Sequence, residues 1–90
     1  MAGGNKTMMV EMESDVYFIE DIGYYHIPQA KGDIPRALDI FRDSKYPFNY
    51  WVIWRAGDDI TKAPRYNRDD LQQARAEAYK QNKLVVGAMK

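Results

Sequence analysis

Three consecutive residues, Tyr24, Tyr25 and His26, include the only histidine among the 90 residues of the chain. Imidazole titrates near neutral pH, with a pKa of roughly 6.5, so His26 could exchange protons with a bound ligand. A catalytic role would also need an orienting carboxylate and an oxyanion site, and the sequence specifies neither near this cluster. We therefore assign Tyr24, Tyr25 and His26 to a candidate binding site and assign no residue to catalysis.

A second aromatic group lies in the middle of the chain and consists of Tyr46, Phe48, Tyr50, Trp51 and Trp54. Aromatic side chains supply much of the buried area of a small core, but they also stack on ligand rings and nucleobases. Arg55 follows the group directly and could contribute a cation–π or phosphate contact. The group therefore predicts a core, a binding surface, or both.

The spacing of the two tryptophans separates these roles. Alternate side chains of a strand point to opposite faces, which puts Trp51 and Trp54 on opposite sides. The face of Trp54 is an unbroken apolar row with Phe48, Tyr50 and Val52. We expect this row to be buried under helices. The face of Trp51 is mixed, and we assign Trp51 and Arg55 to the candidate binding surface.

The composition excludes several classes of site. The chain has no cysteine, so it has no disulfide, thiolate nucleophile or thiolate-bound metal. A single histidine likewise excludes a multi-histidine metal site. The pairs Asp58-Asp59 and Asp69-Asp70 lack the spacing of an EF-hand loop and are expected to belong to a turn and a helix start. We predict no metal site and no cofactor.

Charge is balanced overall but unevenly distributed. Basic and acidic residues both number 13, which argues against a dedicated nucleic-acid binder. Residues 1–30 hold five acids and one base, a net charge of −4, and residues 31–90 hold twelve bases and eight acids, a net charge of +4. The two parts either attract each other within the fold or across a dimer, or they form a bipolar surface that steers a charged partner.

No apolar run approaches the roughly 18 residues that cross a bilayer. Residues 1–7 are polar and glycine-rich and lack the apolar core of a signal peptide. The expectation is a cytoplasmic protein with no membrane contact, in which residues 1–7 form a flexible tail before a single domain over residues 8–90.

The first third of that domain reads as β structure. Residues 8–20 are rich in methionine, β-branched and aromatic residues, and they form either a hairpin turning at Ser14-Asp15 or a longer strand turning at residues 21–23. Residues 24–28 would be the return strand, ended by Pro28. From Ile34, apolar residues at helical spacing predict a short amphipathic helix that begins after Asp33 and ends near Ser44.

The remaining two thirds predict three further elements and one ambiguous segment. Residues 48–55 are apolar on both faces, as in a central strand. Residues 60–66 contain Pro64, which keeps any strand there away from the centre of a sheet. Residues 68–82 form a helix capped by Asn67, and a last strand begins at residues 84–86.

This order predicts an α+β domain with an antiparallel or mixed sheet of three to five strands and two helices on one face, of which a ferredoxin-like arrangement is one candidate. We expect a non-enzymatic interaction module that forms a homodimer through sheet or edge-strand contacts and binds a protein partner or a small aromatic ligand. A second hypothesis is a ferredoxin-like small-molecule-binding domain or enzyme with an aromatic-lined pocket. A third, less favoured, is a nucleic-acid-binding domain.

Overall fold

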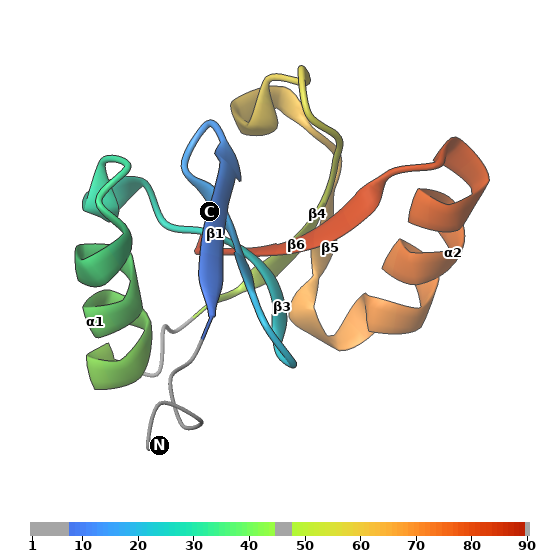
Figure 1. The fold of residues 1–90 in the computed structure, drawn as a ribbon. Helices are drawn as coiled ribbons and strands as arrows, with labels where there is room; N and C mark the ends of the chain where they lie inside the picture. The colour runs from blue at the N-terminus through green and yellow to red at the C-terminus, as the bar shows by residue number, and fades with distance from the viewer. Residues whose placement is uncertain (1–7, 45–47, 90) are drawn as a thin grey trace.

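A computed structural model describes residues 8–44 and 48–89 (Figure 1). Along the chain its main elements are β1 (Met9–Glu13), β2 (Val16–Ile19), β3 (Gly23–His26), α1 (Ile34–Ser44), β4 (Tyr50–Trp54), β5 (Arg65–Asn67), α2 (Leu71–Gln81) and β6 (Leu84–Ala88). Three short 3-10 helices lie between them: η2 (Pro28–Ala30), η3 (Ile60–Lys62) and η4 (Arg68–Asp70). The predicted tail over residues 1–7 and the aromatic residue Tyr46 lie outside the described residues.

The strands form one mixed sheet in the order β1-β2-β3-β6-β4-β5. Neighbouring strands are antiparallel except β3 and β6, which are parallel. The predicted α+β class is confirmed, but the predicted three to five strands are too few. The ferredoxin-like arrangement is wrong, because it needs the strand after β4 at the centre of the sheet. That strand, β5, lies at the edge, as Pro64 before it requires.

Both turns that the sequence offered as alternatives are present. Ser14 and Asp15 have φ angles of 53° and 62° and form a two-residue turn between β1 and β2. A second reversal joins β2 to β3, with Asp21 at φ 69° and Gly23 at φ 135°. A φ of 135° is readily adopted only by glycine. The first three strands are therefore an antiparallel meander built from local turns.

Both helices pack on the same face of the sheet. The buried residues Tyr17 and Ile19 of β2 lie in one cluster with Ala37 of α1, and Ile53 of β4 lies in another with Ala74 and Ala78 of α2. Strand register joins the two clusters, because Tyr17 is opposite Tyr25, Tyr25 is opposite Gly87, and Gly87 is opposite Trp51. In Figure 1 the helices stand on opposite sides, because the twist of the sheet turns its two ends away from each other.

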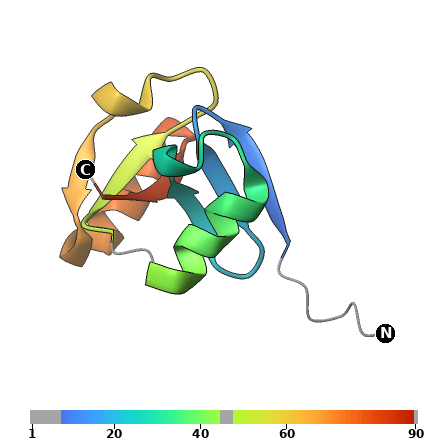
Figure 2. The same ribbon diagram turned by 90° about the vertical axis from the view of Figure 1, so that its left-hand side faces the viewer.

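A tyrosine anchors the start of α1 to the sheet. The Tyr17 hydroxyl accepts a hydrogen bond of 2.9 Å from the backbone N–H of Gly32. Burial raises the pKa of Tyr17 above its usual value of 10.0, so the phenol stays protonated at neutral pH. Figure 2 shows α1 lying across the β1–β2–β3 half of the sheet.

A loop, rather than a helix, covers the other face of the sheet. Trp54 is fully buried there with Val16, Val52 and Val86, and Ile60 of η3 closes the cluster. Burial of Trp54 was expected, but its placement under the helices was wrong: α2 packs on the Trp51 side. A strand pattern defines two faces without showing which of them a distant helix will cover.

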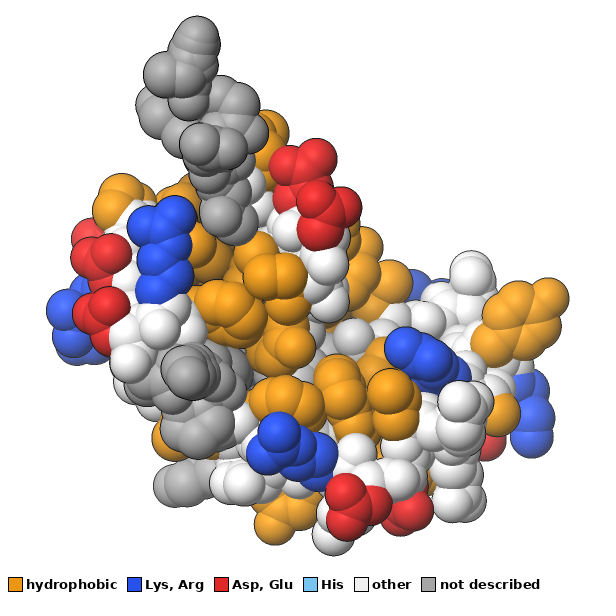
Figure 3. Space-filling model, turned by 90° about the horizontal axis from the view of Figure 1, so that it is seen from below, with side chains coloured by type: hydrophobic (Ala, Val, Ile, Leu, Met, Phe, Trp, Pro, Cys, Tyr) orange, Lys and Arg blue, Asp and Glu red, His pale blue; other side chains and the backbone are white. Residues whose placement is uncertain are grey.

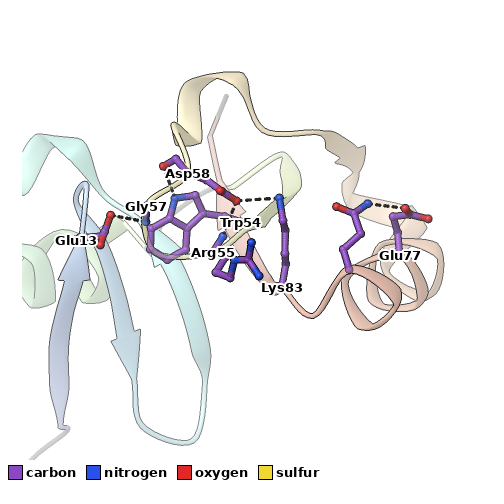
Figure 4. A network of polar contacts seen from close by, with 8 residues as sticks. Glu13, Trp54, Arg55, Gly57, Asp58, Glu77 and Lys83 are labelled. Atoms are coloured by element: carbon purple, nitrogen blue, oxygen red, sulfur yellow. Dashed lines mark hydrogen bonds and ion pairs between the residues drawn. The ribbon is translucent and has the colours of Figure 1, made fainter.

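Polar contacts hold this loop against β1 and against the residue that precedes β6 (Figure 4). The Trp54 Nε1–H donates to the Asp58 carbonyl (3.0 Å), and the Asp58 carboxylate pairs with Lys83 Nζ at 2.9 Å. The bond to Lys83 keeps the pKa of Asp58 below its usual value. The Gly57 N–H donates to Glu13 Oε2 at 2.7 Å. The loop therefore bridges β1 and the start of β6, which are far apart in the strand order.

Substitution of Gly87 tests whether the packing of β3 on β6 requires a residue without a side chain at this position. A Cβ at this position would lie 2.6 Å from Cε2 and 2.7 Å from Cδ2 of Tyr25. We expect Gly87→Ala to lower the free energy of unfolding by about 1–3 kcal/mol, the usual cost of overpacking. Chemical denaturation monitored by tryptophan fluorescence measures it. In a double-mutant cycle with Tyr25→Leu, the penalty should shrink because the ring edge is gone; additive effects would contradict this explanation.

Candidate binding groove

Four aromatic rings form a row between the two helices. Phe41 of α1 lies 5.2 Å from Tyr25 of β3 between ring centroids, Tyr25 lies 5.6 Å from Phe48, and Phe48 lies 4.7 Å from Trp51. These are favourable separations for edge-to-face and tilted contacts. The four side chains are half-buried, so the row belongs partly to the core and partly to the surface.

The row depends on two residues, Gly87 and Phe48, that do not follow the regular strand pattern of large side chains pointing to alternate faces. Gly87 has no side chain, so the ring of Tyr25 lies directly over the backbone of β6. Phe48 precedes β4, which begins at Tyr50, and its ring contacts Tyr25 and Trp51. Its predicted place in the row of Trp54 is therefore wrong, since the alternation rule applies only within a strand.

A half-open groove of about 230 Å³ lies beside this row, between the β2–β3 turn and α2. Its lining residues are Ile22, Gly23, Tyr24, Tyr25, Trp51, Leu71, Arg75 and Val85. Figure 3 shows this side of the molecule, where hydrophobic side chains gather between α1 and α2 and charged side chains lie around them. The groove combines aromatic faces with one guanidinium group.

Two arginines provide the positive charge of this region. The Arg68 guanidinium lies over the Phe48 ring, 4.7 Å from its centroid, and its Nη1 donates to the Phe48 carbonyl at 3.4 Å. The Arg68 carbonyl accepts a hydrogen bond of 2.9 Å from Trp51 Nε1. Arg75 lines the groove, and within residues 8–44 and 48–89 it forms no ion pair. An anionic group in the groove would therefore meet a cation that no carboxylate of the described chain neutralises.

The structure brings the side chains of two of the five predicted site residues, Tyr25 and Trp51, together at the groove. Tyr24 also borders the groove, but its ring lies on the opposite face of the sheet, 4.8 Å from Phe18 between ring centroids and packed against the Val16 cluster. Arg55 and His26 are separate from the groove. Arg55 follows β4, and its backbone N–H donates to Asp58. His26 lies opposite Val16 in the β2–β3 register, on the face away from the helices.

The α2 side of the groove was not predicted from the sequence. Leu71 and Arg75 are four residues apart, so they share one side of the helix. This spacing was visible in the sequence, next to the Ala74 and Ala78 seam that packs on the sheet. The sequence does not show which element lies next to this side of the helix, because no local pattern indicates that α2 lies beside the β2–β3 turn.

The groove contains a phenol that can act as a hydrogen-bond donor. Burial raises the pKa of Tyr25, and the nearby Arg68 offsets part of this rise, so its phenol stays protonated at neutral pH and can donate a hydrogen bond. A second groove, of about 240 Å³, includes Asp58 and Lys83, which neutralise each other. Among the described residues, no three histidine, aspartate or glutamate side chains converge as a metal site would require.

Comparison with known proteins identifies no relative of this chain. No protein-family model matches it, and neither a curated protein nor a solved structure does. Within the described residues, no helix is long and apolar enough to span a membrane. Its function must therefore be inferred from its own side chains.

The two tryptophans should differ in their effects on stability and binding. Trp54 is fully buried, so Trp54→Ala should lower the free energy of unfolding by roughly 3–5 kcal/mol. Trp51 is only half-buried, so Trp51→Ala should cost less and leave the fold intact. Thermal and chemical denaturation of both variants measure this order. A larger loss for Trp51→Ala would mean that the groove side, not the loop side, holds the main core.

His26 should make stability depend on pH. Burial lowers its pKa below 6.5, Arg65 adds to this decrease, and Asp15 opposes it. The unfolded chain therefore binds a proton more readily than the folded chain. Stability from this residue is complete above about pH 6.5, the unfolded value, and decreases as the pH falls below it. The decrease in melting temperature from pH 7.5 to pH 5 should be smaller in His26→Gln than in the wild type. An equal decrease in both proteins would assign the pH dependence to other groups.

Proposed function

We propose that the chain is a non-enzymatic binding module whose groove holds a small aromatic anion, such as a ring bearing a carboxylate. The observation that carries the proposal is the juxtaposition of the Tyr25 and Trp51 rings with the Arg75 guanidinium in one groove. Aromatic faces select a planar apolar ring, and the cation selects a negative group beside it.

The dimensions of the groove agree with this ligand class. An enclosed apolar cavity of roughly 150 Å³ holds a benzene molecule, so a groove of about 230 Å³ has room for a fused two-ring system. The groove is open on one side, which leaves space for a polar substituent to reach Arg75. A ring bound here would lie against half-buried aromatic side chains that already form a fixed row.

The competing hypotheses receive less support. Nucleic-acid binding needs several cations around one open aromatic surface, but Arg65 lies on the sheet face opposite Trp51 and Arg55 lies at the loop. Dimerisation through the Trp51 face needs a flat surface, but Trp51 is half-buried against Tyr66 and the α2 cluster. A concave aromatic groove is the geometry typical of a small-molecule site.

The test is a titration with 2-naphthoate followed by the two indole N–H signals in a ¹⁵N-correlated NMR spectrum. Trp51 lines the groove and Trp54 lies on the other face, so the Trp51 signal should shift and the Trp54 signal should not. The uncharged ring compound 2-naphthalenemethanol should bind more weakly, because it lacks the group that meets Arg75.

Matched variants separate the cation from general charge effects. Arg75→Gln should weaken naphthoate binding by up to about fivefold, since an exposed ion pair contributes roughly 0.2–1 kcal/mol. Lys80→Gln removes one positive charge from the same helix outside the groove and should leave the affinity unchanged. Equal shifts of both indole signals, or equal losses in the two variants, would contradict the proposed site.

A further inference from the structure

β1 is an edge of the sheet with its outer side open to pairing. Within the described chain it pairs with β2 alone, and it lies at the border of the molecule (Figure 2). The Met8 carbonyl accepts a hydrogen bond from the Glu20 N–H at 2.9 Å, so the backbone of Met8 points toward β2. Because backbone direction alternates along a strand, Val10 also points toward β2, and Met9 and Glu11 direct their N–H and C=O groups outward.

The two edges of the sheet differ in how they resist pairing. β5 has three residues, follows Pro64 and begins with Arg65, and each of these features blocks strand addition. β1 has five residues, of which Val10 (50% exposed) and Met12 (44%) are exposed apolar residues, and Met8 (58%) directly precedes it. The bulge between Glu11 and Glu13 interrupts the register at Met12 and leaves Met9, Val10 and Glu11 in regular pairing. β1 is therefore the edge that is suited to accept another strand.

We propose that β1 pairs antiparallel with β1 of a second copy of this chain, about a two-fold axis through Val10. The inference is independent of the groove. In this register Val10 lies opposite the partner's Val10, and Met8 lies opposite the partner's Met12. The outward backbone groups of Met9 meet those of the partner's Glu11, which forms a hydrogen-bonded pair.

Charge selects this register from the others that the backbone permits. Only residues that direct their backbone groups outward can form the hydrogen-bonded pairs, so the axis can pass through Met9, Val10 or Glu11. An axis through Glu11 would place two glutamates directly opposite each other, which is destabilising. An axis through Met9 would leave Met12 unpaired. The axis through Val10 brings Met8 and Met12 of the two copies together and opposes Glu11 to the partner's Met9.

The pair should be weak and dependent on salt. One added strand on each side gives an interface at the small end, below about 1,200 Å², where complexes are transient. The acidic residues of the first 30 positions come together in this dimer, and like charges repel. Higher ionic strength screens that repulsion. Sedimentation of the wild type should therefore show more dimer at 0.5 M than at 0.05 M sodium chloride.

Disulfide trapping tests the register directly, because the chain has no cysteine of its own. Val10→Cys would face its own copy across a non-hydrogen-bonded pair, where the Cα atoms lie about 4.5 Å apart, within disulfide range. Under mild oxidation this variant should form a covalent dimer. Tyr79→Cys, at a site 90% exposed on α2, is the control for random collision and should form far less covalent dimer.

Two further variants make the outcome decisive. A mixture of Met8→Cys and Met12→Cys should form the mixed dimer faster than either variant forms a dimer with itself. Adding Glu11→Pro to Val10→Cys removes an outward N–H and should abolish trapping, with the fold checked by thermal melting. If that variant unfolds, the cysteine mixture decides instead. Val10→Cys trapping no faster than Tyr79→Cys, or no preference for the mixed dimer, would overturn the proposal.

Discussion

The close contact between the ring of Tyr25 and the backbone of Gly87 is the constraint on which the arrangement of this protein depends. It lies at the parallel pair of β3 and β6, where backbone pairing within the described sheet joins the N-terminal meander to β6, β4 and β5. A side chain at Gly87 would displace the ring. With the ring in place, Phe41 of α1 and Phe48 before β4 both contact it. Because Gly87 has no side chain, the Tyr25 ring can contact both halves of the sheet, helix α1 and the candidate groove.

The two faces of the sheet are closed by different means, and this difference determines where a ligand can bind. On the loop side, the tryptophan Trp54 is sealed by apolar contacts, and the loop is held by bonds from Gly57 to Glu13 and from Asp58 to Lys83. On the helix side, α1 and α2 cover opposite ends of a twisted sheet. The aromatic row lies between them, half-buried, so aromatic surface remains accessible on the helix side.

The candidate groove and the β1 edge use different chemistry. The groove offers rings, a protonated phenol and a guanidinium, which suit a flat anion. The edge offers backbone donors and acceptors beside alternating apolar side chains, which suit another strand. The uneven charge bears on both sites. The acidic first 30 residues oppose pairing of β1 with itself, while Arg68 and Arg75, from the basic remainder, flank the aromatic row.

Local sequence determined most of the elements of this protein, and the tertiary structure determined which of them meet. Short-range chemistry accounts for the turn at Ser14-Asp15, the helix after Asp33, the edge position after Pro64 and the 3-10 helix η4, which Asn67 caps and which leads into α2 at Leu71. The sequence also drew attention to Tyr25 and Trp51, which the structure places in one groove. It missed β6 as a central strand and Leu71 and Arg75 as groove residues, and it put the helices on the wrong side of Trp54. These features depend on pairing between β3 and β6, about 60 residues apart, and a strand's own pattern defines two faces without identifying what will cover either one.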